Sequence, residues 1–269
     1  MASITTSSDG GLPPLSAGAS WQEYSAANLA AFCEQLARAM DRHWVRWDDA
    51  WAADPQGPSP FFNSATLLRP LDPTQTDALI DRLSHFYAAR SGAPWLLWSA
   101  WPVSASDLQR RGFELLTRLP LMVRPPGGGL PTPPPLLRIV EATDAATVAD
   151  GERVVIDGYP LPELQPVRAG SLFDTRGVGE RLRLWVGYLD ERAVATATAL
   201  IDETVNGIYM VATLPQVRGR GYGAALTAQA LAAAPALPAV LEATEAGYSL
   251  YARLGFTEVT RYDLWMRPR

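Results

Sequence analysis

The sequence predicts an α+β fold with mixed strand pairing, built from two related halves. Three observations lead to this expectation. The second half alternates strand-like and helix-like segments, a glycine-rich turn joins one of these strands to the next helix, and the first half repeats the order in a weaker form. With 269 residues, 48% of them hydrophobic, the chain can bury the core of one large or two ordinary domains.

Composition narrows the class of protein. A net charge of −5 and a pI near 5.1 argue against nucleic acid as a partner, because such binding needs a basic surface. No apolar run approaches the ~20 residues that span a bilayer, and the first residues lack the features of a secretory signal. The single cysteine, Cys33, excludes an internal disulfide and fits a cytoplasmic location. Two histidines without metal-ligand spacing predict no metal.

The chain begins with a segment rich in Ser, Gly and Pro, so residues 1–20 are expected to be a flexible N-terminus. Residues 21–54 carry apolar side chains at helical spacing and predict one or two helices. Within them Trp44, Trp47 and Trp51 recur at i, i+3 and i+7. This spacing predicts a packing stripe on one face of a helix.

A Pro/Gly-rich stretch, "RPPGGGLPTPPPL", divides the chain nearly in half. It cannot form a helix or a central strand, so residues 125–135 are expected to be a semi-rigid linker. The linker separates residues 21–124, a helical segment followed by a degenerate domain, from residues 136–269, the better-defined domain.

The second half shows strand and helix signals with short turns between them. The turn-forming "DER" joins two alternating segments and predicts an antiparallel hairpin, and Gly255 ends the last helix. The expected elements are, in order, a strand over 136–142, a helix over 144–159, strands over 181–190, 192–202 and 206–214, a helix over 224–234, a strand over 239–244, a helix over 246–255 and a strand over 257–267.

The two halves also resemble each other in sequence. Placing Leu108–Pro125 on Tyr251–Pro268 without gaps gives eight identities. They are Arg110/Arg253, Gly112/Gly255, Phe113/Phe256, Thr117/Thr260, Arg118/Arg261, Leu121/Leu264, Arg124/Arg267 and Pro125/Pro268. We interpret the first half as a diverged copy of the second. A chance match, and an unrelated helical partner-binding domain in the first half, are the alternatives.

The stretch "PQVRGRGYGAAL", Pro215–Leu226, joins a predicted strand to a predicted helix, a place where several folds bind phosphate. Gly219, Gly221 and Ala224 satisfy the spacing of the dinucleotide fingerprint, with Glu242 near the position of its acidic residue. The chain beyond Ala224 is too short for the doubly wound sheet that this fingerprint needs. A P-loop is excluded because all 23 basic residues are arginine, and no lysine can reach the phosphates.

The segment "RGRGYG", Arg218–Gly223, resembles the Arg/Gln-x-x-Gly-x-Gly/Ala loop of the GCN5-related N-acetyltransferase (GNAT) superfamily. "GYSLYARLGF", Gly247–Phe256, is similar to a second signature of this family, a helix with a tyrosine before a Leu-Gly-Phe turn. The resemblance covers residues 136–269. It implies the GNAT fold, a mixed and mostly antiparallel twisted sheet flanked by helices, in tandem with a diverged N-terminal GNAT-like half.

The resemblance implies acetyl-CoA as co-substrate and an amine that attacks the thioester directly, without a metal. The glycines let backbone N–H groups approach a pyrophosphate, and the helix after them adds its positive N-terminal end. The strand before the loop would run along the pantetheine arm and turn an amide toward the thioester carbonyl. The implied cofactor-binding residues are Val211, Ala212, Thr213, Arg218, Gly219, Arg220, Gly221, Tyr222, Gly223, Ala224, Thr244 and Tyr251.

Tyr251 falls on the tyrosine that, in the family, donates a proton to the departing thiolate. Thr244 and Gly247 stand where the family often has Asn and Ala, which weakens the cofactor contact expected of Thr244. The first half has Leu108 in the place of the tyrosine and "PLDPTQTD" in the place of the glycine loop. We therefore expect the first half to bind no coenzyme A.

The sequence does not identify the general base or the acceptor. Glu203, at the end of a predicted strand, is the catalytic candidate, with Glu242, Glu245 and solvent water as alternatives. A small-molecule or peptide amine is the expected partner, and the chain is expected to be a monomer or homodimer. A non-catalytic acyl-CoA sensor or interaction module is the alternative function. Aromatic residues that could shape the acceptor pocket, or pack in the core instead, are Tyr159, Trp185, Tyr188 and Tyr209.

Overall fold

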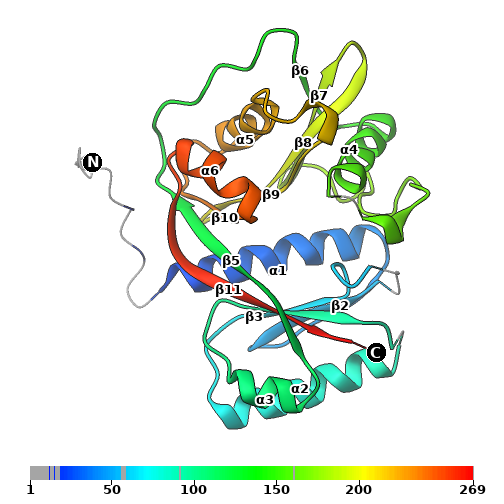
Figure 1. Ribbon diagram of the computed structural model, residues 1–269, viewed down its shortest axis with the longest axis vertical. Coiled ribbons are helices and arrows are strands. Elements are labelled where there is room, and N and C mark those ends of the chain that lie inside the picture. The colour runs from blue at the N-terminus through cyan, green and yellow to red at the C-terminus, as the bar shows by residue number, and fades with distance from the viewer. Residues whose placement is uncertain are drawn as a thin grey trace.

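The computed structural model describes residues 12, 15, 19–55, 59–90, 92–159 and 161–268. The predicted flexible N-terminus, residues 1–20, lies almost wholly outside this part of the chain. The described residues form one eleven-stranded mixed sheet with helices on both faces (Figure 1). The predicted α+β class is confirmed. None of the described helices is long and apolar enough to cross a membrane.

The described chain has six α-helices and eleven strands. The helices are α1 (Trp21–Ala39), α2 (Pro73–Ala88), α3 (Ala105–Arg110), α4 (Ala145–Gly158), α5 (Tyr222–Ala232) and α6 (Glu245–Arg253). The strands are β1 (His43–Arg46), β2 (Ala50–Asp54), β3 (Ser64–Leu67), β4 (Trp95–Ser99), β5 (Glu114–Arg124), β6 (Arg138–Glu141), β7 (Leu182–Leu189), β8 (Arg192–Ile201), β9 (Asn206–Thr213), β10 (Ala239–Glu242) and β11 (Thr257–Arg267).

The strands of the two halves interleave in the centre of the sheet. Their order is β1-β2-β3-β4-β11-β5-β10-β9-β8-β7-β6, so the last strand of each half lies beside a strand of the other half. β11 pairs with β4, β5 pairs with β10, and β5 and β11 pair with each other, all in antiparallel. The halves are therefore joined by a reciprocal strand exchange, visible where β5 and β11 cross in Figure 1.

The strand exchange involves the same residues as the sequence repeat, because β5 and β11 lie in the two matching segments. β5 and β11 are both eleven residues long, and each follows a short helix, α3 or α6. Repeated residues face each other across the pseudo-twofold axis between these strands, since Leu121 pairs with Thr260 and Thr117 pairs with Leu264. The interpretation of the first half as a diverged copy is confirmed, and the unrelated helical domain is excluded.

The repeated glycine and arginine form two matched clamps. Gly255 follows α6 with a φ of +86°, and Arg124, at the end of β5, donates from Nε to the carbonyl oxygen of Leu254 at 2.7 Å. Gly112 follows α3 with a φ of +79°, and the Arg267 guanidinium lies so close that a Cβ at Gly112 would overlap it. Each exchanged strand thus brings an arginine to a helix end of the other half.

The segment with three tryptophans differs from the expectation. Trp44 lies on β1, Trp51 lies on β2, and Trp47 stands in the turn between these strands. The prediction of a helix over them is wrong, although the tryptophans do pack, with Trp51 in a core cluster and Trp44 packed against that cluster. All five residues of β2 are buried, and burial between two layers of helices overrides the local helical spacing.

Helices α4 and α5 cover opposite faces of the C-terminal part of the sheet. Gly151 of α4 packs against Leu184 and Val186 of β7, whereas Gly187 of the same strand packs against Leu226 of α5. The absence of a Cβ at both glycines allows the helix and the strand to approach closely.

Helix α1 links the halves outside the sheet. It starts with a capping box, in which the Ser20 side chain accepts from the amide of Glu23 and the Glu23 carboxylate accepts from the amide of Ser20. It lies between the two halves, as Figure 1 shows, and Phe32 stacks on Tyr209 of the second half with ring centroids 4.4 Å apart. Tyr209 and α4 lie on the same face of the sheet, so α1 and α4 share that face.

We expect Arg124→Met to lower the melting temperature by about 6 °C, because it removes a charge-assisted hydrogen bond from a buried helix end, a loss of about 2 kcal/mol. Arg118→Met is a matched control on the same strand, since the pair of Arg118 with Asp263 is exposed. Differential scanning calorimetry measures both variants. Equal melting temperatures for the two variants would contradict the clamp.

Candidate active site

An opening in the sheet lies between β9 and β10. These strands pair in parallel only at Asn206 with Ala239 and at Gly207 with Val240. Both strands continue beyond these pairs without bonding to each other in the described chain. The end of β9 is therefore free of a strand partner on the side that faces β10.

A bulge bends β9 at the same place. The register with β8 shifts here, and Met210 adopts a φ of +49°, which is strained for a residue with a side chain. The bulge re-aims residues 211–213, the segment that the sequence assigned to the pantetheine arm. Tyr159, at the end of α4, donates from its hydroxyl to the carbonyl oxygen of Val211 at 3.0 Å. The opening thus has β9 on one side and the end of α4 on its face.

The glycine loop follows β9 directly and ends at α5. Gly219 and Gly221 have φ values of +77° and +83°, a region that favours glycine. Gly221 is the N-cap of α5, and no side chain caps the helix. Within the described residues, the amides of residues 219–224 donate to no acceptor of the protein. A helix N-terminus with its amides unsatisfied is a ready site for an anion.

The equivalent helix of the first half has a closed N-terminus. The carboxylate of Asp72 accepts from the amide of Gln75 at 2.8 Å, and the Gln75 side chain accepts from the amide of Asp72 at 3.2 Å. Pro73, at the first position of α2, has no N–H to offer. A negative side chain therefore already occupies the place that is left open at the N-terminus of α5.

The two arginines of the loop have different surroundings. Arg218 donates from Nε to the carbonyl oxygen of Thr213 at 3.1 Å and from its terminal nitrogen to that of Gly158 at 2.6 Å. Its guanidinium therefore holds the loop to the end of β9 and to the end of α4. Arg220 is exposed and has no partner among the described residues. Of the two, Arg220 is the one free to meet a ligand.

The remaining loop residues have packing roles. Tyr222 is 8% exposed and belongs to the core. A Cβ at Gly223 would lie 3.3 Å from both Leu250 and Thr213, so α5, α6 and β9 are closely packed at this residue. Ala224 is partly buried on α5.

Tyr251 lies on α6 and is partly buried, with its ring 5.9 Å from that of Phe256. Burial, and secondarily the neighbouring Tyr159, raises the pKa of the Tyr251 phenol. Burial also raises the pKa of Tyr159 to about 12. Both hydroxyls therefore remain protonated at neutral pH and can donate hydrogen bonds.

Two departures from the expected signature have structural explanations. The Thr244 side chain accepts from the amide of Gly247 at 3.2 Å and caps α6. A Cβ at Gly247 would lie 2.7 Å from the Tyr251 ring. Thr244 therefore positions the tyrosine helix, and Gly247 makes room for the ring.

The glutamates that the sequence offered as candidates for the general base lie at different distances from the glycine loop. Glu203 stands in the turn before β9 and lines a cavity of about 520 Å³ there with Arg181 and Thr204. The glycine loop is at the other end of the strand, roughly 25 Å away. Glu203 is thus separated from Tyr251, and Glu245 lies exposed in the first turn of α6.

Glu242 is the last residue of β10, at the edge of the opening. Its Oε1 accepts from the hydroxyl of Ser25 on α1 at 2.7 Å. The Ser25 hydroxyl also accepts from that of Tyr262 at 3.1 Å. Burial raises the pKa of Glu242 to about 7, and the bond from Ser25 partly offsets this rise. Sequence reasoning missed Ser25 because it lies more than 200 residues from its partner and outside any motif.

Of the four aromatic residues named for the acceptor pocket, three lie in the core. Trp185, Tyr188 and Tyr209 are at most 7% exposed. Tyr159 is 38% exposed and borders the opening.

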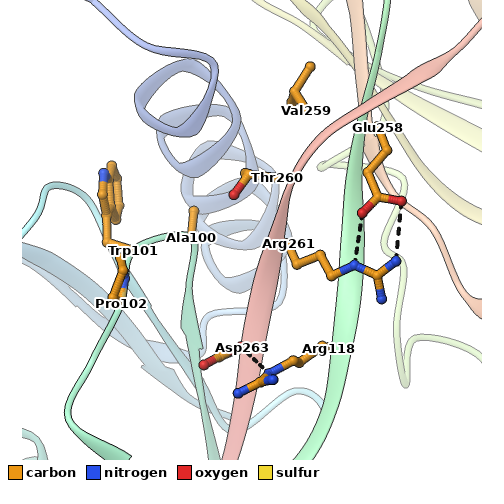
Figure 2. A pocket seen from close by; sticks show the side chains of 9 residues that line it. All are labelled: Ala100, Trp101, Pro102, Arg118, Glu258, Val259, Thr260, Arg261 and Asp263. Atoms are coloured by element: carbon orange, nitrogen blue, oxygen red, sulfur yellow. Dashed lines mark hydrogen bonds and ion pairs between the residues drawn. The ribbon is translucent and has the colours of Figure 1, made fainter.

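A cavity of about 640 Å³ lies away from the glycine loop, where β11 meets the loop after β4. Figure 2 shows that ion pairs of Arg118 with Asp263 and of Arg261 with Glu258 lie along it. Its charged groups are thus already paired with each other. The described residues contain no group of three or more His, Cys, Asp and Glu side chains that could hold a metal ion.

Comparison with known proteins identifies the C-terminal half. Residues 180–258 match the family model described as the acetyltransferase (GNAT) domain. This range includes β7 to β10, the glycine loop and Tyr251. The C-terminal half therefore carries a GNAT domain. A search of curated proteins gives no match.

Solved structures share the fold of nearly the whole chain. A GCN5-related N-acetyltransferase from Kribbella flavida has a TM-score of 0.66 at 20% identity, covering 89% of this chain and 95% of its own. One from Sphaerobacter thermophilus has a TM-score of 0.54 at 17% identity, covering 91% and 94%. A tandem GNAT protein from the clavulanic acid biosynthesis pathway has a TM-score of 0.54 at 12% identity, covering 91% and 95%. The tandem GNAT fold predicted from the sequence is thus confirmed.

We expect Glu242→Gln to raise the melting temperature by about 4 °C at pH 8 and to change it little at pH 5. The raised pKa of Glu242 means that stability is lost as pH rises from the ordinary value of a glutamate, 4.5, to about 7. A glutamine removes this loss and still accepts from Ser25. Glu245→Gln is the control, and thermal melts at both pH values are the measurement. A gain that is the same at pH 5 and pH 8 would contradict the enclosed carboxyl group.

Proposed function

We propose, from the GNAT domain at residues 180–258, that the chain is an acetyl-CoA-dependent N-acetyltransferase whose C-terminal half alone is active. The observation that carries this proposal is the uncapped, glycine-bounded N-terminus of α5 at the end of a strand that diverges from its neighbour. The same place in the first half is closed by Asp72.

Coenzyme A carries a pyrophosphate, which needs several donors at once. The free amides of residues 219–224 and the positive end of α5 supply them, and the exposed Arg220 adds a positive charge. Arg218 acts indirectly, because its bonds to Thr213 and Gly158 fix the loop. The unpaired side of β9 over residues 211–213 would receive the pantetheine arm.

The chemistry follows from the groups at the opening. A neutral amine attacks the thioester carbonyl, a C–N bond forms, and the C–S bond breaks. The departing thiolate takes a proton, and Tyr251 can donate it because its phenol stays protonated at neutral pH. The acceptor is a small-molecule or peptide amine.

The first half lacks the corresponding parts. β3 ends at Leu67, and three of its four residues pair with β4, so no comparable opening forms. Leu108 stands where the second half has Tyr251, and it is 1% exposed in the core. We therefore assign this half a supporting role and no coenzyme A.

We expect isothermal titration calorimetry to detect one acetyl-CoA per chain, and Arg220→Glu to weaken binding ~10-fold by placing a negative charge beside the pyrophosphate. Arg192→Glu makes the same charge change on β8 and is the matched control. If titration of acetyl-CoA into the wild-type chain gives no heat of binding, the proposal is wrong. If Arg220→Glu and Arg192→Glu weaken binding equally, Arg220 does not contact the pyrophosphate.

We expect Tyr251→Phe to lower the turnover number ~10- to 100-fold while acetyl-CoA affinity stays within about twofold, because a phenol that donates in the transition state is lost. Tyr248→Phe, exposed on the same helix, is the control. Release of free thiol with a panel of amines measures turnover. Binding without transfer to any amine would favour the acyl-CoA sensor instead.

A further inference from the structure

We propose that Glu242 takes the proton from the acceptor amine, and that Ser25 of the N-terminal half positions it for this task. The inference rests on the proposed acetyl transfer. It assigns a catalytic residue to the C-terminal half, and it gives the diverged half a direct part in the active site.

Glu242 lies where the two strands separate. It ends β10, and Ala243 then donates from its amide to the carbonyl oxygen of Pro120 on the exchanged strand β5. Thr244 follows at once as the cap of the helix that carries Tyr251. The carboxyl group and the phenol therefore stand on consecutive elements that border one opening, at the end of β9 where the thioester is expected.

The side chain of Glu242 points toward the face covered by α1 and α4. Its partner Ser25 lies on α1, and α4 contributes Tyr159 to the same opening. Because the glycine loop lies beside α5, on the other face, coenzyme A and the acceptor would reach the thioester from opposite sides. A base on the α1 face is thus on the side from which the amine arrives.

The groups that face Glu242 carry no compensating charge. From α1 they are Ser25 and Cys33, from β9 Tyr209, and from β11 Tyr262. Burial raises the pKa of Cys33 to about 12 and the pKa values of both tyrosines well above 10, so all three are neutral at pH 7. No arginine of the described chain forms an ion pair with Glu242.

The buried serine orients the carboxylate. Ser25 is 0% exposed, donates to Oε1 of Glu242 and accepts from Tyr262, which fixes its hydroxyl between two partners. The second carboxylate oxygen receives no hydrogen bond from another residue of the described chain. This second oxygen, which has no partner on another described residue, is the one that we assign to the acceptor amine. Ser25 is a positioning residue and does not touch the reacting atoms.

This arrangement points to an alkylamine acceptor, which reaches the site as an ammonium ion. The ionised Glu242 takes one proton, and the neutral amine attacks the thioester carbonyl. The C–N bond forms, the C–S bond breaks, and the sulfur receives a proton from Tyr251. The second N–H proton returns to Tyr251, and Glu242 releases its proton to water. A titration near pH 7 suits such a shuttle.

The first half lacks this base. Ser99 ends β4 as Glu242 ends β10, and its hydroxyl donates to the carbonyl oxygen of Trp101. The difference agrees with a single working site, and it supplies a matched control serine that is 1% exposed.

The test uses the full chain with acetyl-CoA and excess n-butylamine as acceptor. We expect Glu242→Gln to lower the rate ~100-fold at pH 7, to abolish the rise in rate with pH near 7, and to leave acetyl-CoA affinity unchanged. Ser25→Ala should move that rise to higher pH, because the bond from Ser25 lowers the pKa of Glu242. Ser25→Thr should restore the profile, and Ser99→Ala should leave it unchanged.

A second readout does not depend on turnover. NMR of the chain with 13C-labelled glutamate gives the carboxyl signal of Glu242, which is identified as the signal that Glu242→Gln lacks. This signal should titrate near pH 7 in the wild-type chain, and its pKa should be higher in Ser25→Ala. A normal rate in Glu242→Gln would overturn the assignment of Glu242 and leave the proposed function standing. The same holds if the wild-type chain binds acetyl-CoA but does not acetylate n-butylamine. Absence of acetyl-CoA binding would overturn the proposed function itself.

Discussion

The antiparallel pairing of β5 with β11 is the interaction on which the rest of the molecule depends. It aligns two similar eleven-residue strands about a pseudo-twofold axis and turns two incomplete sheets into one. Because each strand continues into the opposite half, Arg124 and Arg267 reach helices that belong to the other repeat. Four of the repeated residues, Gly112, Gly255, Arg124 and Arg267, form the two clamps at this crossing.

The two halves differ at the N-termini of α2 and α5. The first amides of a helix are satisfied either by a capping side chain or by a partner outside the helix. Asp72 caps α2 in the first half, whereas Gly221 leaves the amides of α5 uncapped in the second half. The first half thereby gains a more self-sufficient helix, and it contributes α1 and β5 to the surroundings of the other site. In the function proposed above, the first half would thus form one wall of the site in the second half.

The sequence predicts those parts of the molecule that local chemistry determines. The positive φ values at Gly219 and Gly221 and the place of Tyr251 follow from short motifs, as do most strands of the second half. The hairpin that holds Trp44 and Trp51 was mistaken for a helix because burial on both faces leaves no alternation to detect. Glu203 lies in the turn between β8 and β9 and Glu242 ends β10, and only the pairing of β9 with β10 shows which of these places borders the opening. The bond from Ser25 to Glu242 and the strand exchange join distant segments and leave no local signal.

The exchanged strands also determine when the protein can fold. Ser99, in the first half, pairs with Asp263, which the ribosome adds 164 residues later. The inner edge of β4 therefore stays open during most of synthesis, and β5 waits for β10 in the same way. Such long-range pairing favours slow, largely post-translational folding and exposes strand edges that other nascent chains could join. The architecture that joins the two repeats thus requires both of them to be synthesised before the centre of the sheet can form.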